Sequence, residues 1–452
     1  MKTKITIEAG AWKKALATLN TVVSSRTALP ILGDVLLRYD AEQKLFQLTA
    51  SDNESWLTLD CRHDADTPWI HIIEDDQRDR FSAVCLPFAR LKEAVGLLPA
   101  AALLSVWFDG DSHLMTVDYQ IGKFSIPFED ALEYPVCPDV VEPSTPAYAD
   151  LKAQLDAAKA AGDEARKSEI LGQFVGMASP VCRFTLPSAQ LLPLMKQARI
   201  CAANDELRPI MNGECLEVFN DRLVVVASDG HTMFKDVLDL GLGSGWLQYG
   251  EFPAFDAATQ QQGSARLIVP KTVMAALTTA FANSEQLQIT ADTQRMVFRS
   301  EGVVLVTRCI DGKYPNYDSV IPTDSPLRVV VSREALRLAL RRLSLFANSS
   351  SNMAIMRRDG EHFVIEASDM EFSSSGSEQV TIHEGDAFMQ ADFQIGFKIS
   401  SALTLLDAIP TDNVVLFFSE PSRAFLYKPE DVKSARLLLQ MPMLINETPS
   451  EP

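Results

Sequence analysis

The stretch CLEVFNDRLVVVASD, residues 215–229, decides the fold, because two other parts of the chain repeat its pattern. It reads as an alternating apolar strand, a polar turn and a second strand, which is the signature of a β-hairpin. LLRYDAEQKLFQLTASD at 36–52 and IMRRDGEHFVIEASD at 355–369 follow the same plan, and all three stretches end in Ala-Ser-Asp. The same tripeptide at the end of the same hairpin three times indicates a triplicated domain.

The spacing of the three aspartates agrees with a triplication that is interrupted once. Asp52 and Asp229 are 177 residues apart, whereas Asp229 and Asp369 are 140 residues apart. The excess matches a segment after residue 140 that begins like a linker and becomes rich in Ala, Lys, Glu and Asp. That composition predicts an exposed helix or helical hairpin broken at Gly162. We therefore predict a first repeat over 1–140, a linker with a helical insertion over 141–178, a second repeat over 179–322 and a third repeat over 323–452.

Length and composition fit three ordinary domains of a cytoplasmic protein. The 452 residues are 47% hydrophobic, which is enough for packed cores. No window approaches the roughly 18 apolar residues of a membrane span, and the alternating N-terminus, MKTKITIEAGAWKK, lacks the apolar region of a signal peptide. Seven cysteines without a CxxC pair favour reduced thiols over a disulfide framework.

Each repeat reads as a set of strands with two helices. The first helix of each repeat is predicted from its apolar spacing. It covers residues 11–25 in the first repeat, begins near Ser188 in the second and covers residues 333–347 in the third, directly after Ser332, which is a suitable N-cap. Pro193 interrupts the second of these patterns and is tolerated best near a first turn. The predicted class is α+β, with the two helices of each repeat on one face of antiparallel sheets. The shorter second helices are predicted over residues 87–98, 270–281 and 400–409.

Charge gives two opposing indications about nucleic acid. The net charge of −19 argues against a nucleic-acid partner for the protein as a whole. The polar faces of the three predicted first helices are nevertheless basic, although a solvated face is the ordinary explanation for any one of them. Three equivalent faces of the same sign predict a positive surface that could hold a phosphate backbone without reading its sequence. The basic residues are Lys13, Lys14, Lys196, Arg199, Arg337 and Arg341.

Several stretches, in order and over nearly the whole chain, match one protein family. They are SRTALPILGDVLL at 25–37, ELRPIMNG at 206–213, VVVASDGHTMF at 224–234, DGKYPNYDSVIP at 311–322, IGFKISSALTLLDAI at 395–409 and LLLQMPMLI at 437–445. In these motifs and their spacing the chain resembles the beta sliding clamp of bacterial replicative DNA polymerases, the DNA polymerase III beta subunit. By this resemblance it is a divergent member with an insertion between its first two domains.

The resemblance implies the DNA clamp fold, in which three similar domains each pack two helices on antiparallel sheets and the homodimer is ring-shaped. It implies a processivity factor for DNA replication that encircles duplex DNA and tethers the replicative DNA polymerase. The clamp loader and other proteins with a clamp-binding motif would be further partners. No catalytic residue, cofactor, metal or membrane contact is expected, and the expected location is the cytoplasm, in association with the nucleoid.

The resemblance also implies roles for individual residues. Arg26 and Arg208 would contact DNA. In the dimer, Phe124 and Ile126 of one subunit would meet Leu345 and Phe346 of the other, although such residues can also be ordinary core. A partner-peptide pocket between the second and third domains would comprise Met211, Ser228, Gly230, His231, Thr232, Met233, Pro315, Val320, Met441, Pro442 and Met443. For Met441 and Met443, ordinary core packing at a terminal strand is the alternative explanation.

Two other classes of function stay open at this point. Asp229 and His231 lie on one turn and could bind a metal or act as acid and base, but no second His or Cys stands at ligand spacing from His231. Asp52 and Asp369 occupy the same place without a histidine, which predicts that the aspartate caps a turn. GLGSG at 241–245 lacks the Lys-Ser/Thr of a phosphate loop and is predicted to be a turn. A scaffold that binds only proteins and does not encircle DNA is the alternative to a clamp.

Overall fold

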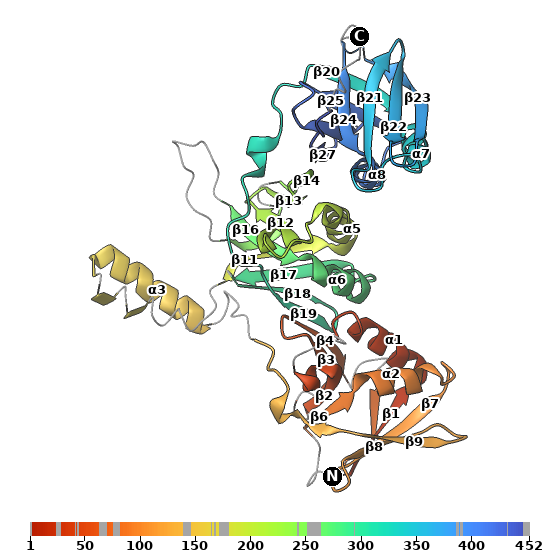
Figure 1. The fold of residues 1–452 in the computed structure, drawn as a ribbon. Helices are drawn as coiled ribbons and strands as arrows, with labels where there is room; N and C mark the ends of the chain where they lie inside the picture. Colours follow the sequence, from red (N-terminus) through yellow and green to blue (C-terminus); the bar gives the residue numbers. More distant parts are fainter. Residues whose placement is uncertain are drawn as a thin grey trace. The chain divides into compact units, whose positions relative to one another are not determined.

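The computed structural model has the predicted α+β architecture, and its described residues form two compact units (Figure 1). Unit 1 contains Met1–Leu192, Ser244–Phe252 and Thr272–Cys309, and unit 2 contains Pro193–Gly243, Pro253–Lys271 and Ile310–Pro452. The structure describes the whole chain except residues 1, 24–28, 41, 43–44, 63–69, 76–81, 139–145, 164, 167–168, 171–179, 242–243, 251–263, 293, 386–387, 389–391, 432 and 446–452.

Unit 1 holds two sheets, one of five and one of ten strands. In spatial order, the smaller sheet contains β5 (Ile70–Asp75), β1 (Lys2–Glu8), β7 (Leu103–Asp109), β8 (Leu114–Asp118) and β9 (Lys123–Pro127). The larger sheet contains β10 (Glu129–Asp130), β6 (Ala83–Pro87), β2 (Asp34–Asp40), β3 (Leu45–Ser51), β4 (Ser55–Arg62), β19 (Val303–Arg308), β18 (Arg295–Ser300), β17 (Gln286–Asp292), β11 (Pro180–Pro187) and β15 (Leu247–Gly250).

Unit 2 is built on one sheet of twelve strands. In the described part of both units, neighbouring strands pair in antiparallel fashion. In spatial order the strands are β16 (Ala265–Pro270), β12 (Gly213–Val218), β13 (Arg222–Ser228), β14 (Thr232–Asp239), β27 (Leu437–Gln440), β26 (Phe425–Pro429), β25 (Asn413–Phe418), β20 (Leu327–Ser332), β23 (Ser374–Glu384), β22 (His362–Asp369), β21 (Met353–Asp359) and β24 (Gln394–Lys398).

The six helices predicted for the repeats are present, and they end earlier than the apolar patterns suggest. Ser332 caps α7 as predicted, because its hydroxyl accepts a hydrogen bond from the Ala335 N–H at 3.3 Å. α5 begins at Ser188 as predicted, but it continues through Pro193. The helices are α1 (Ala9–Leu19), α2 (Phe88–Gly96), α5 (Ser188–Ala198), α6 (Met274–Ala280), α7 (Arg333–Leu343) and α8 (Ile399–Asp407).

The predicted insertion contains a seventh helix, α3 (Pro146–Ala161). It ends at the predicted break, where Gly162 adopts φ +67°, a left-handed conformation that glycine tolerates best. The Asp163 carboxylate then accepts a hydrogen bond from the Arg166 N–H at 2.9 Å, which is the geometry that begins another helical turn. Residues 141–145 and 171–178 of the insertion lie outside the described residues.

All three predicted hairpins form, as β2–β3, β12–β13 and β21–β22. The aspartate that ends each one caps the following turn, as predicted. Asp52 accepts hydrogen bonds from the N–H groups of Glu54 and Ser55, at 2.9 and 2.6 Å, and Asp369 accepts one from Glu371 at 2.9 Å. The repeated Ala-Ser-Asp is therefore a structural signal, because the carboxylate satisfies backbone donors that the turn leaves unpaired.

Two strand pairings connect parts of the chain that the repeat predicts to be separate domains. In unit 1, β4 pairs with β19 and places Trp56 opposite Val306; we call this pairing the first joint. In unit 2, β14 pairs with β27 and places Met233 opposite Leu439; we call this pairing the second joint. Trp56 and Met233 occupy equivalent positions, because each pairs with the serine of its own Ala-Ser-Asp. The two joints are thus the same construction made twice.

The predicted repeat boundaries stay a prediction, because the two compact units share the residues of the second repeat between them. Each unit instead contains one complete joint. Among the described helices, none combines the length and the apolar character needed to cross a membrane.

Candidate functional site

The turn after β13 in unit 2 holds the centre of the predicted partner site. Asp229 accepts hydrogen bonds from the N–H groups of His231 and Thr232, at 2.8 and 2.6 Å, so its carboxylate is used within the turn. Gly230 adopts φ +88°, which other residues rarely adopt. The Ser228 hydroxyl donates to the Thr232 carbonyl at 2.8 Å and accepts from the Gly230 N–H at 3.1 Å. This network fixes the shape of the turn and leaves the His231 side chain exposed.

The C-terminal segment lies directly against this turn. The Met441 N–H donates to the His231 carbonyl at 2.8 Å, and Thr232 pairs with Gln440 across the second joint. Beyond Pro442, the Met443 N–H donates to the Gly396 carbonyl at 2.7 Å. The structure therefore brings together the turn and the Met-Pro-Met segment, which are more than 200 residues apart in the sequence.

A buried apolar layer supports this surface. Met233 and Leu439, opposite each other in the joint, pack with Tyr314 and Tyr317 in one core cluster. The Tyr317 hydroxyl donates to the Glu217 carboxylate, which also accepts hydrogen bonds from Arg266 at 2.9 Å and Ser264 at 2.6 Å. Tyr317 opens the short helix η6 (Tyr317–Val320), so this buried network anchors the segment that carries Val320.

The predicted pocket residues divide into a floor and an exposed rim. Met211, Thr232 and Met233 are buried and form part of the packed interior. His231, Pro315, Val320 and Met441 are exposed, and Val320 and Met441 have exposed fractions of 51% and 39%. Pro315 and Val320 flank the buried Tyr317 along the chain. Exposed flexible methionine beside an anchored apolar floor suits a site that receives varied apolar side chains.

Arg208, predicted to contact DNA, lies at this site. Its Nε donates to the Asp205 carboxylate at 2.8 Å. A Cβ atom placed on Gly230 would be 2.9 Å from Arg208 Nη1 and 3.9 Å from Met211 Cε. The guanidinium is therefore packed across the turn, next to two predicted pocket residues. Sequence reasoning did not anticipate this neighbourhood, since Arg208 and Gly230 are joined only by the tertiary fold.

The other predicted DNA contacts fall into two groups. Lys14, Lys196, Arg199 and Arg341 are exposed at their helices. Lys13 instead donates to the Leu98 carbonyl, and Arg337 makes two hydrogen bonds of 2.9 Å to Glu334. The side chains of the first group are available to phosphate, whereas those of Lys13 and Arg337 are already engaged within their own units. Arg26 lies outside the described residues.

The predicted dimer residues lie at a strand edge and at a helix end. Phe124 and Ile126 are on β9, which is an edge strand of the five-stranded sheet; Phe124 is half-buried and Ile126 is already buried in its own unit. Leu345 and Phe346 follow α7 and are exposed, with an exposed fraction of 79% for Leu345. A Cβ on Gly376 of β23 would lie 3.0 Å from the Phe346 ring, so Phe346 packs beside that strand.

Two buried sites in unit 2, an ion pair and a single carboxyl group, were not anticipated from the sequence. The Arg436 guanidinium donates to the Asp236 carboxylate at 2.8 Å at the end of the second joint, where both side chains are largely buried. Glu214 on β12 is fully buried, and neither carboxylate oxygen has a hydrogen-bond partner among the described residues. Burial raises the pKa of Glu214 to about 8, despite the opposing effect of Arg199 and Lys271. Nothing in the local sequence marks either site.

No cluster of three or more His, Cys, Asp or Glu side chains suited to a metal occurs in the part of the chain that the structure describes. GLGSG at 241–245 lies partly outside that part, since residues 242–243 are not described.

Comparison with known proteins agrees with this geometry. Residues 318–443 match the family model of the DNA polymerase III beta subunit, C-terminal domain. The beta sliding clamps of Synechocystis sp. and of Caulobacter vibrioides are each 23% identical to the chain, covering 92% and 93% of it and 92% and 94% of their own lengths.

Over nearly its whole length the chain is similar to beta sliding clamps, and its C-terminal part matches the DNA polymerase III beta subunit family model.

Solved structures of clamps share its fold. The DNA polymerase sliding clamp from Bacillus subtilis matches with a TM-score of 0.77 at 19% identity, covering 98% of this chain and 100% of its own. The DNA polymerase III beta chain from Streptococcus pneumoniae matches with a TM-score of 0.78 at 17% identity over the same shares. The predicted clamp fold is therefore confirmed, although sequence identity is low.

Proposed function

We propose that this chain is a DNA sliding clamp, in which two subunits form a ring around duplex DNA and tether a replicative DNA polymerase. Its similarity to beta sliding clamps over nearly the whole chain supports this function. Within the molecule, the proposal rests mainly on the joints between repeats. Both joints use equivalent strands, and we expect a third joint of the same kind to form between two copies of the chain.

The strands that would form the third joint have free edges. Among the described residues, β9 pairs only with β8, and residues 374–380 of β23 pair only with β22. β23 is the counterpart of β4 and β14, since each follows the Ala-Ser-Asp turn of its repeat. β9 is the counterpart of β19, because Ile126 and Val306 each lie eight residues before a Tyr-Pro. Free edges attract strands, and pairing β23 of each copy with β9 of the other closes a ring.

The repeat also predicts which residues would face each other across this third joint. Ser375 pairs with the serine of its own Ala-Ser-Asp, as Trp56 and Met233 do, so it takes their place. By analogy with Trp56 opposite Val306, Ser375 would lie opposite the partner's Ile126. Ser377 would then face the partner's Phe124, next to the exposed Leu345 and Phe346 that we assign to the dimer interface.

The DNA and partner roles follow from the same placement. The exposed cations Lys14, Lys196, Arg199 and Arg341 would meet the phosphate backbone, which gives binding without sequence preference. The exposed rim of His231, Val320 and Met441 would receive a short peptide of the polymerase, the clamp loader or another clamp-binding protein. In this proposal the protein catalyses no reaction, and it works on the nucleoid in the cytoplasm.

Retention on DNA tests the proposal. The full-length protein is loaded onto nicked circular DNA, and its retention is compared with that on the same DNA after linearisation. Retention on the circle and loss through the linear ends are expected for a topological clamp. Equal loss from both would contradict encirclement and would leave a scaffold that binds only proteins.

A cross-link tests the third joint separately. In a Phe124→Cys/Ser377→Cys variant, oxidation should join two copies, because facing residues of paired strands place their Cα atoms within disulfide range. The cross-linked ring should stay on circular DNA after denaturation. Each single variant is the control, and an absent cross-link in the double variant would contradict the register.

A further inference from the structure

The first joint carries a groove that the proposed function does not use. It lies within unit 1, on the face of the ten-stranded sheet where β4 meets β19, and has a volume of about 630 Å³. Apolar and aromatic side chains line it, including Tyr134, Val304 and Val306, together with Thr58. We call it the Arg38 groove, after the arginine on β2 that lines it.

The second joint shows why this space is open. There, Tyr317 packs against Met233 and Leu439. In the first joint, Trp56 and Val306 hold the places of Met233 and Leu439, and the side chain packed against them is Cys137. Cys137 is the counterpart of Tyr317, because each stands three residues after the tyrosine of the Tyr-Pro. A thiol therefore occupies the position where the other joint has a phenol ring, and the volume of that ring is left unfilled.

One side-chain position beside the groove also carries opposite charges at the two joints. Leu36 and Cys215 occupy equivalent hairpin positions, so Arg38 is the counterpart of Glu217. The Glu217 carboxylate is buried and fully hydrogen-bonded, whereas the Arg38 side chain is exposed and makes no hydrogen bond or ion pair with any residue in the described part of the chain. Among the described residues, the other charged side chain in the lining is that of Arg299. In a protein of net charge −19, the groove is a local positive site.

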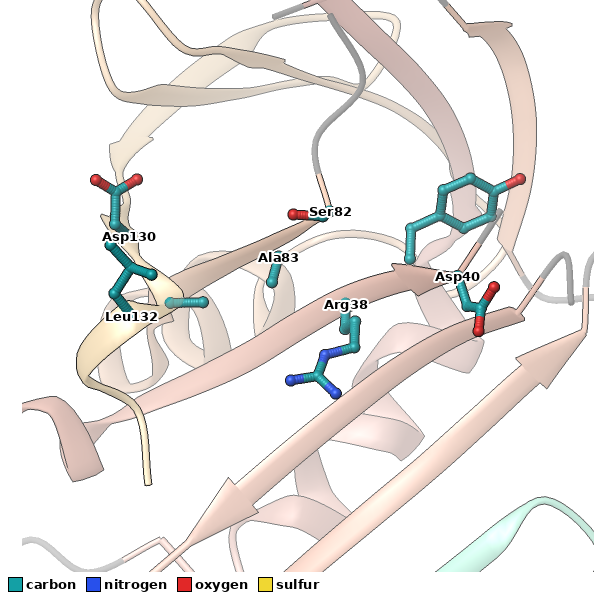
Figure 2. A pocket seen from close by; sticks show the side chains of 8 residues that line it. Arg38, Asp40, Ser82, Ala83, Asp130 and Leu132 are labelled. Atoms are coloured by element: carbon teal, nitrogen blue, oxygen red, sulfur yellow. The ribbon is translucent and has the colours of Figure 1, made fainter. Parts of the chain in front are cut away.

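The groove continues into a second hollow of about 670 Å³, shown in Figure 2. Arg38 and Leu132 line both, and Ala83 of β6 lies between them in this view. Leu132 has an exposed fraction of 93%. Asp40 and Asp130 line only the second hollow, so Arg38 lies between an acidic hollow and the groove, whose own lining contains neither aspartate.

We propose that the Arg38 groove binds a linear peptide of a partner protein that carries an acidic residue next to a large apolar or aromatic side chain. The apolar side chain fills the space that Tyr317 fills at the other joint, between Tyr134, Val304 and Val306. The acidic residue pairs with Arg38, since a guanidinium and a carboxylate form strong charge-assisted hydrogen bonds. The apolar lining favours a peptide over a nucleic acid, which would meet only two cations there. This site is additional to the partner site at the second joint.

A peptide selection on the intact protein tests the proposal. A phage-displayed library of random peptides of about 12 residues is selected against the full-length chain, and the enriched peptides are then measured by fluorescence anisotropy. We expect an enriched class with an acidic-apolar pair. Its affinity should fall about tenfold or more in Arg38→Glu, because a charge-assisted pair is lost, and it should be abolished in Cys137→Tyr, which fills the groove.

Matched controls separate this site from the others. Arg90→Glu reverses an exposed arginine on α2, outside the groove, and should leave the affinity unchanged. Bound peptide should slow alkylation of Cys137, while Cys309, the other partly exposed cysteine, reacts as before. Thermal unfolding shows whether each variant is folded.

Two results would overturn the proposal. One is a selection in which no enriched class responds to Cys137→Tyr. The other is binding of a single-stranded oligonucleotide that is lost in Arg38→Glu and is not displaced by the selected peptides, which would make the groove a nucleic-acid site. Neither result bears on retention of the ring on DNA, so the proposed function stands or falls separately.

Discussion

The two joints of this chain have the same backbone and different side chains. At the first joint the Arg308 N–H donates to the Glu54 carbonyl at 2.9 Å, and at the second joint the Met441 N–H donates to the His231 carbonyl at 2.8 Å. Glu54 and Arg308 also form an ion pair, with an N–O distance of 3.5 Å. His231 and Met441 cannot form one. The same place in the fold thus carries an exposed ion pair at one joint and an exposed histidine and methionine at the other.

Other positions differ in the opposite sense, with apolar residues in unit 1 and charged residues in unit 2. Leu59 faces Val303 at the first joint, and the counterparts at the second are the buried pair Asp236 and Arg436. The buried Val35 of β2 has Glu214 as its counterpart on β12. Pairing geometry therefore supplies the architecture of both joints, whereas the side chains placed on it decide what kind of partner each joint can receive. Exchanging side chains between the joints therefore tests each assignment.

The largest effect is expected from removing half of the buried ion pair. Arg436→Val should lower the free energy of unfolding by about 3–5 kcal/mol, because the Asp236 carboxylate is left buried without its partner. Adding Asp236→Leu recreates the apolar pair of the first joint and should recover most of the loss. Chemical denaturation of both variants measures the difference. If the double variant were as unstable as the single one, the two joints would not be interchangeable here.

The next effect concerns the buried carboxyl of Glu214. Its pKa is raised to about 8 by burial, so the folded state holds a proton that the unfolded state releases at much lower pH. Stability from this group is therefore present below about pH 4.5 and is lost as pH rises towards 8. Glu214→Val introduces the residue found at the equivalent position of unit 1. In the parent protein the titration should lower the free energy of unfolding by on the order of 3 kcal/mol between pH 5 and pH 8, and this variant should abolish that loss.

Unfolding midpoints measured across that pH range distinguish this cause from simple repacking. A gain that grows with pH supports the titration, whereas a constant gain indicates better packing alone. Glu214→Gln serves as the control, since it keeps the shape of the side chain and removes the charge. It should flatten the pH dependence as well.

A smaller loss is expected when the filled joint is made like the open one. Tyr317→Cys should lower the free energy of unfolding by about 2–3 kcal/mol, because it leaves a cavity beside Met233 and removes a hydrogen bond to Glu217. It should also weaken partner binding through Val320, which follows on the same short helix. Tyr317→Phe separates the two causes, since it keeps the ring and removes only the hydroxyl. Stability of Tyr317→Cys equal to that of the parent would contradict the role of Tyr317 as the floor of the site.

The smallest effect on stability, and the most informative for function, is expected from transferring the surface ion pair. His231→Glu with Met441→Arg places the Glu54–Arg308 pair at the second joint. It should change stability by less than about 1 kcal/mol and weaken binding of a clamp-binding peptide about tenfold or more, because the exposed apolar rim is lost. Calorimetric titration measures the affinity. The reciprocal variant, Glu54→His with Arg308→Met, is the control and should leave it unchanged.

Much of this architecture was predictable because the relevant signals are local. The alternating pattern at 215–229 and its two counterparts predicted the hairpins, since strand periodicity is written in neighbouring residues. The cap of α7 at Ser332 and the break at Gly162 are equally local. By contrast, the sequence offered no sign that Arg208 packs across Gly230, because the contact depends on how two separate turns meet.

The three repeated hairpins, the α+β class and the resemblance to clamps could be read from the sequence, because a repeated pattern and a set of spaced motifs can be recognised without coordinates. Tertiary structure alone decided how each joint is finished. Cys137 and Tyr317, or Leu59 and Asp236, acquire their meaning only when strand pairing sets each opposite its neighbour. The physical reason is that burial and charge pairing depend on residues far apart in the chain, whereas periodicity and capping depend on residues close together.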